Sequence, residues 1–155
     1  MTVTGNRTFP KCQLPEGSSG DWSIRRVALP ARAVEVADDR PDCFRYRPGD
    51  YTELRCGGIT FMTDLYDEWW TQRRAIERAR EVGGSVLVTG LGLGVVVKEM
   101  LADGVSASIR RIVVLERSAD VIRLAAPSLL AELGCRLNVV QIGRASCRER
   151  VWRYV

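Results

Sequence analysis

The sequence of 155 residues contains no histidine, and this absence excludes several kinds of site. Ser-His-Asp and Cys-His nucleophile systems need an imidazole as the base, and histidine is the commonest metal ligand among side chains. The five cysteines include no Cys-x-x-Cys pair, so neither a metal cluster nor a disulfide framework is indicated. We therefore expect reduced thiols, no bound metal and a cytoplasmic protein.

Long apolar runs and a strong excess of charge are also missing. The longest apolar run, Val86–Val97, is interrupted by glycines and is shorter than the about 20 residues that cross a bilayer. No signal peptide is predicted at the N-terminus. Of the formal net charge of +4, three charges come from residues 142–155, which hold four arginines and one glutamate. We expect no membrane and no nucleic-acid partner, and the oligomeric state stays open.

The sequence does contain a glycine-rich segment that joins an apolar run to a helix-like run. Residues 85–94 read Ser-Val-Leu-Val-Thr-Gly-Leu-Gly-Leu-Gly, and Val95–Leu101 follow. We predict a buried parallel strand, a sharp turn through Gly90, Gly92 and Gly94, and a helix whose N-terminus faces the turn. Glycine allows positive φ and close backbone approach, and the N-terminal N–H groups of a helix favour negative charge. The segment predicts a cradle for a nucleotide or nucleoside.

An acidic residue stands at the end of the next predicted strand. Residues 112–116 read Ile-Val-Val-Leu-Glu, and Glu116 comes 22 residues after Gly94. In doubly wound sheets the glycine turn and this strand end lie at the same edge, where ligands bind, and a carboxylate there accepts hydrogen bonds from ribose hydroxyls. Each feature alone also occurs as a plain turn or a helix cap. Their combination predicts a small-molecule nucleoside site.

The chain divides into four parts by composition. Residues 1–21 are rich in Thr, Gly, Ser and Pro and are predicted to be a loose N-terminal arm. Residues 22–62 are predicted to be a small antiparallel β appendage with a hairpin turn at Gly57-Gly58. Its strand-like runs cover 24–29, 33–36, 43–46, 51–56 and 59–62. Residues 63–141 are predicted to be an α/β domain, and residues 142–155 a non-native tail.

Helix-like and strand-like runs alternate within the α/β part. A helix is expected from Thr63 or Asp64 to about Val82. Strands are predicted over 85–89, 112–116 and 137–141, and helices over 95–103, 119–126 and 128–133, the last two separated by Pro127. This alternation predicts a parallel, incomplete doubly wound sheet. With the strand order 3-2-1, strand 85–89 is an edge whose apolar run lacks a neighbour, so we expect self-association.

The spacing of the glycines distinguishes two kinds of nucleoside site. The dinucleotide fingerprint Gly-x-Gly-x-x-Gly would place its third glycine where the chain has Val95. The observed Gly-x-Gly-x-Gly resembles motif I of class I S-adenosylmethionine-dependent methyltransferases, and the resemblance covers residues 85–141. It implies that the three glycines surround the methionine part of the cofactor and that Glu116 binds the ribose. The acid that this family usually carries after the third strand, against adenine, is missing here.

Residues 57–70 extend the resemblance to a narrower family. The segment 57–64 followed by Asp67-Glu68-Trp69-Trp70 looks like the β-hairpin and helix that begin the spermidine synthase-like domain. This implies a Rossmann-like transferase that uses S-adenosylmethionine or its decarboxylated relative. Polyamine synthesis is not implied, because Val95-Val96 and Thr71-Gln72 stand where aminopropyltransferases carry Asp-Gly and Tyr-His.

Residues 142–151 resemble a translated DNA sequence that does not belong to a natural gene. Residues 142–151 read Ile-Gly-Arg-Ala-Ser-Cys-Arg-Glu-Arg-Val, which looks like the translation of a common sequencing adapter. We therefore expect the natural protein to continue past Gln141 and the present chain to be an inactive fragment. Catalytic residues of the family lie mostly beyond this point, and none is named. Two alternatives stay open, an NAD(P)-binding Rossmann oxidoreductase fragment and a non-catalytic binding or structural protein.

Overall fold

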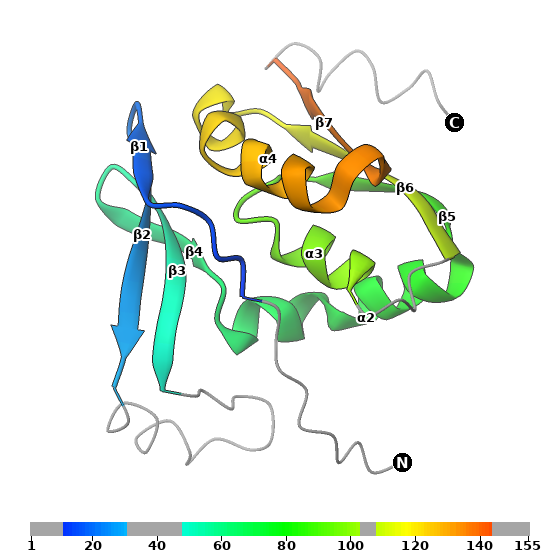
Figure 1. Cartoon of the computed structure of the whole chain (residues 1–155), viewed down its shortest axis with the longest axis horizontal. Helices are drawn as coiled ribbons and strands as arrows, with labels where there is room; N and C mark the ends of the chain where they lie inside the picture. The colour runs from blue at the N-terminus through cyan, green and yellow to red at the C-terminus, as the bar shows by residue number, and fades with distance from the viewer. Residues whose placement is uncertain (1–10, 31–47, 103–107, 144–155) are drawn as a thin grey trace.

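The computed structural model describes residues 11–30, 48–102 and 108–143, which form two sheets with three α-helices (Figure 1). The antiparallel sheet has the order β1 (Gly17–Ser19), β2 (Trp22–Leu29), β3 (Gly49–Cys56) and β4 (Ile59–Thr63). The parallel sheet has the order β5 (Gly84–Thr89), β6 (Ile109–Glu116) and β7 (Leu137–Gln141). The expected strands 33–36 and 43–46, and the tail beyond residue 143, lie outside the described residues.

The helices connect and cover the parallel strands. They are α2 (Tyr66–Val82), α3 (Val95–Leu101) and α4 (Ala119–Leu133), and the short 3-10 helix η2 (Gly134–Arg136) leads into β7. The α/β class, the parallel sheet and the antiparallel sheet at the N-terminal side are therefore as predicted. So is the place of β5 at an edge of the parallel sheet.

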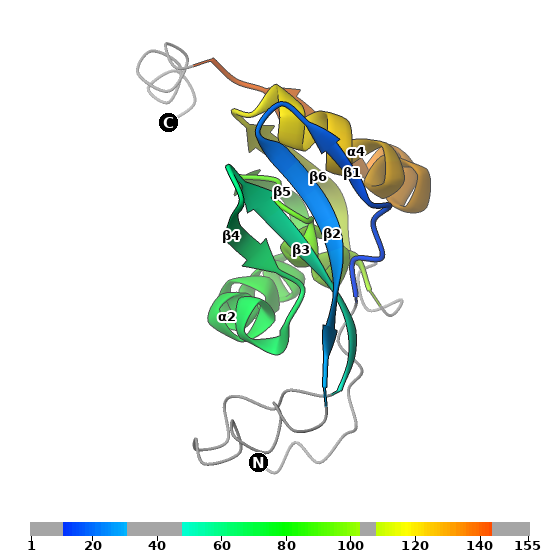
Figure 2. The ribbon, with the colours of Figure 1, turned by 90° about the vertical axis from the view of Figure 1, so that its left-hand side faces the viewer.

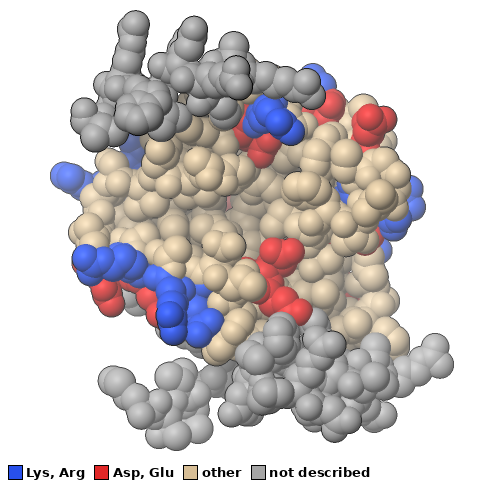
Figure 3. All heavy atoms as spheres, turned by 180° about the vertical axis from the view of Figure 1, so that it is seen from behind, with Lys and Arg blue, Asp and Glu red and all other residues tan. Residues whose placement is uncertain are grey.

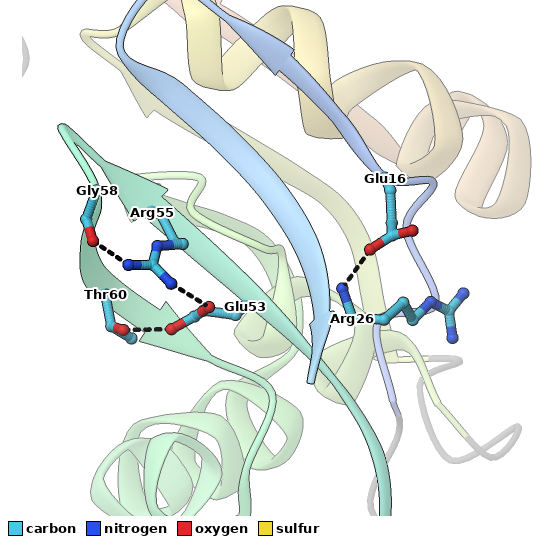
Figure 4. A network of polar contacts seen from close by, with 6 residues as sticks. All are labelled: Glu16, Arg26, Glu53, Arg55, Gly58 and Thr60. Carbon is cyan, nitrogen blue, oxygen red and sulfur yellow. Dashed lines mark hydrogen bonds and ion pairs between the residues drawn. The ribbon is translucent and has the colours of Figure 1, made fainter. Parts of the chain in front are cut away.

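The hairpin between β3 and β4 turns where the sequence predicts. Gly57 and Gly58 have φ of 57° and 81°, the left-handed values that a tight two-residue hairpin turn requires. Figure 4 shows how side chains brace it: the Glu53 carboxylate accepts from the Thr60 hydroxyl and pairs with Arg55 at 3.3 Å, and Arg55 donates to the Gly58 carbonyl. This network holds β4 against β3.

The N-terminal segment is not a loose arm where it is described. Cys12 and Leu14 are each 1% exposed, and β1 pairs with β2. The buried Asp64 carboxylate accepts from the backbone N–H of Cys12 at 2.8 Å and of Thr52 at 2.6 Å, and so ties this segment to β3. Asp64 therefore does not cap α2, whose N-cap is Leu65. These contacts join residues far apart in sequence, which composition does not reveal.

Helix α4 is continuous through Pro127, and the expected break into two helices is wrong. A proline removes one helical hydrogen bond, which costs about 3 kcal/mol in an interior position. Here the apolar face of α4, with Ala125, Ala126 and Leu129 buried, packs onto the sheet and offsets that loss. At its N-terminus Asp120 accepts from Ser19 of β1 at 2.7 Å, so α4 also contacts the antiparallel sheet (Figure 2).

The described helices cover one face of the parallel sheet. Helices α3 and α4 pack against the side that carries Val88 and Val114 (Figure 1). On the opposite side Leu87 is 63% exposed and Val140 is 38% exposed, so the expected burial of β5 on both faces is wrong. Seen from behind, most of the surface is made of side chains other than Lys, Arg, Asp and Glu (Figure 3). An apolar strand at a sheet edge favours pairing with other chains.

We expect the wild-type chain to self-associate at high concentration, and Leu87→Glu to reduce this association by placing a charge on the bare face. Light scattering over a concentration series measures it. The control is Leu130→Glu, which adds the same charge at an exposed leucine of α4. A monodisperse wild-type monomer at high concentration contradicts the expectation.

The thiol of Cys12 predicts a change of stability at alkaline pH. Burial, and then the nearby Asp64 carboxylate, raise the pKa of Cys12 from its ordinary value of 9.0 to about 12. Between these values the unfolded chain loses the proton while the folded chain keeps it, so stability falls as the pH rises. Above about pH 9 we expect the free energy of unfolding to fall less steeply in Cys12→Ala than in wild type. The difference between the two slopes should be about 1.4 kcal/mol per pH unit.

Urea unfolding at several alkaline pH values measures this difference. The matched control is Cys135→Ala, which removes an exposed thiol from another part of the chain. Equal slopes for wild type and Cys12→Ala would show that the thiol does not titrate differently in the two states.

Candidate functional site

The glycine turn and the end of β6 meet at one cavity. It has a volume of about 360 Å³ and opens at the carboxyl-terminal edge of the parallel sheet, with the antiparallel sheet as its opposite wall. Its lining residues are Trp22, Leu54, Phe61, Met62, Val88, Gly90, Leu91, Gly92, Val95, Val96, Val97, Glu116, Arg117, Ser118 and Val121. Most are apolar, and the charged ones are Glu116 and Arg117. The volume is at the lower end of the range for small-molecule sites, roughly 300–1,000 Å³.

The three glycines of the turn, residues 90–94, serve three different purposes. All have positive φ, between 51° and 86°. Gly90 lines the cavity, and a Cβ on it would meet no described atom within 4 Å. A Cβ on Gly92 would overlap the sulfur of Met62, and one on Gly94 would lie 2.5 Å from Cδ1 of Leu129. Gly94 therefore serves the packing of α4 and, unlike the other two, is not part of the cavity wall.

Glu116 connects the turn to the second strand. One carboxylate oxygen accepts from the backbone N–H of Leu91 at 2.7 Å, and the other accepts from the N–H of Ser118 at 2.7 Å. The N–H of Gly90 also donates to the carbonyl of Leu115 at 2.8 Å. Each carboxylate oxygen has a second lone pair, so Glu116 can accept further hydrogen bonds from a molecule in the cavity.

Two ion pairs hold α3 at the end of the turn. Arg80 of α2 pairs with Glu99 at 3.3 Å, with both side chains largely buried, and Lys98 pairs with Glu132 of α4 at 2.9 Å. A buried pair needs close geometry because its desolvation is costly. Helix α3 is thus fixed between α2 and α4, and the turn before it is fixed with it.

The sequence did not reveal the wall that the antiparallel sheet supplies. Trp22 and Phe61 contact each other edge to face with centroids 5.0 Å apart, and Leu54 and Met62 lie beside them in the lining. The pairing of β3 with β4 is irregular between Leu54 and Arg55, where Leu54 pairs with Met62 and Arg55 with Thr60. This bulge leaves Phe61 without a partner residue and brings Met62 opposite the fully buried Leu54.

The tryptophans of α2 lie elsewhere. Trp69 packs against the hydrophobic core. Trp70 stacks on Tyr66 with centroids 5.7 Å apart and carries the Arg73 guanidinium 3.4 Å from its ring centroid. Neither tryptophan lines the cavity.

The described residues offer neither a metal site nor a membrane-spanning helix. Among the described residues no three Cys, Asp or Glu side chains gather as a metal site, and none of the helices is long and apolar enough to span a membrane. No family model, no curated protein and no solved structure matches the chain. The assignment of a function therefore rests on the geometry of the cavity.

The packing role of Gly94 can be tested by stability. We expect Gly94→Ala to lower the free energy of unfolding by about 2–4 kcal/mol, because it adds a left-handed alanine and overpacks Leu129. Gly57→Ala is the matched control: its φ of 57° in the hairpin turn is also left-handed, but its Cβ meets no described atom within 4 Å. We expect the control to lose about 1–2 kcal/mol. Equal losses in urea unfolding would contradict the packing role.

Proposed function

We propose that the cavity binds the nucleoside part of S-adenosylmethionine or of its decarboxylated relative, and that the chain is a methyltransferase-like, spermidine synthase-like fragment of a transferase. The observation that carries the proposal is that Glu116 lies in the wall of the same cavity as Gly90 and Gly92. This is the carboxyl edge of a parallel sheet, where nucleosides bind in doubly wound folds. In this proposal Glu116 accepts from the ribose hydroxyls.

The apolar wall suits the flat base of such a nucleoside. Trp22 and Phe61 offer aromatic rings for contact with adenine. No acid follows β7 within the described residues, which there are Ile142 and Gly143. Adenine would accordingly be held by apolar contact rather than by a carboxylate.

The alternatives have less support. A nicotinamide dinucleotide needs room for a second nucleotide, whereas Val95 stands at the position of the third glycine and lines a cavity of about 360 Å³. A non-catalytic binding protein would use the same cavity without chemistry. A cytoplasmic location stays a prediction from the sequence.

We expect 5′-methylthioadenosine to bind the wild-type chain, and Glu116→Ala to weaken this binding about tenfold or more. The lost hydrogen bonds to a charged acceptor are worth about 1.5–3 kcal/mol. Titration calorimetry measures the affinity. Asp120→Ala is the control, because it removes a nearby carboxylate that is not part of the cavity wall. Unchanged affinity in Glu116→Ala, or tighter binding of NAD⁺, would overturn the proposal.

A further inference from the structure

We propose that Met62 determines the specificity of the cavity: its thioether admits adenosine with a short 5′-thioether and excludes adenosine that carries an amino-acid tail. This inference rests on the proposed nucleoside function. It also narrows that function: in this chain the cavity fits the nucleoside part and a short 5′-thioether, bound through the ribose at Glu116, whereas the amino-acid tail of S-adenosylmethionine does not fit beside Gly92 while Met62 keeps this position.

The sulfur of Met62 already occupies the space beside the glycine turn. A Cβ on Gly92 would overlap Sδ of Met62, so nothing as large as a methyl group fits between them. The backbone N–H of Leu93 donates to the same sulfur at 3.2 Å. The protein's own thioether thus lies where the resemblance places the methionine part of a cofactor.

Met62 and Glu116 stand next to each other along the turn. Glu116 accepts from the N–H of Leu91, and Met62 accepts from the N–H of Leu93, two residues further on. The resemblance implies that a nucleoside with its ribose on Glu116 directs its 5′ substituent along the turn, toward Gly92. A short substituent ends before Met62, whereas an amino-acid tail must displace it.

The fold places Met62 beside the turn. The bulge in β4 sets Met62 opposite the fully buried Leu54, so its side chain points inward. The Glu53, Arg55 and Thr60 contacts brace the hairpin (Figure 4), and none of these three residues lines the cavity. Methionine is a flexible side chain, and the hydrogen bond from the Leu93 N–H favours the observed position of its sulfur.

The test compares two ligands that differ in the tail, S-adenosylhomocysteine and 5′-methylthioadenosine, by titration calorimetry. We expect wild type to bind S-adenosylhomocysteine no more tightly than 5′-methylthioadenosine. In Met62→Ala we expect S-adenosylhomocysteine to bind about tenfold more tightly, because its carboxylate then reaches the Leu93 N–H. The affinity for 5′-methylthioadenosine is expected to change less than about threefold.

Further variants separate the effect of the size of the side chain at position 62 from an effect on the stability of the fold. Met62→Leu keeps the bulk and is expected to keep the wild-type preference. Met62→Val is a second truncation that retains strand propensity, for use if Met62→Ala does not fold. Ile59→Ala changes a 74% exposed residue of the same strand and is expected to behave as wild type.

The outcomes distinguish the two proposals. A wild-type preference of tenfold or more for S-adenosylhomocysteine, or an equal effect of the truncations on both ligands, overturns the role of Met62 and leaves the nucleoside site in place. If neither nucleoside binds wild type or any Met62 variant, the proposed function fails, and the role of Met62 fails with it.

Discussion

Side chains from three different elements press on the backbone of the glycine turn, residues 90–94. Met62 of β4 lies on Gly92, Leu129 of α4 lies on Gly94, and Glu116 of β6 accepts from the N–H of Leu91. A Cβ on Gly92 would force the Met62 side chain to shift, and one on Gly94 would force the Leu129 side chain to shift. The positions of the hairpin, the helix and the parallel sheet relative to one another therefore depend on how closely they approach this turn.

The buried carboxylates in the described part of the chain hold elements together. Asp64 binds the N-terminal segment to β3, Glu53 braces the hairpin, and Glu99 joins α3 to α2. Each has partners because an unpaired buried charge is very costly. Glu116 also has backbone partners, but it differs from these three in lying in the wall of the cavity. Among the described residues, Glu116 is the carboxylate that lines the cavity and can reach a ligand there.

Local patterns in the sequence predict some of these features well. The hairpin at Gly57-Gly58, the turn after β5 and the position of Glu116 at a strand end follow from residues close together in the chain. The inward position of Met62 does not, because it depends on a bulge in the pairing of two strands. The same holds for the ordered segment around Cys12, whose partner Asp64 is far away in the sequence. The continuity of α4 through Pro127 likewise depends on tertiary packing.

The two sheets share the cavity wall, and this has a thermodynamic consequence. Trp22 and Met62 come from the antiparallel sheet, whereas Val88 and Glu116 come from the parallel sheet. A molecule that fills the space between them contacts both and binds only while both are docked. Such a molecule therefore raises the free energy of separating the two sheets by RT ln(1 + [L]/Kd). Occupancy and cooperative unfolding are in this way one linked equilibrium, in which a bound molecule makes the two sheets melt together.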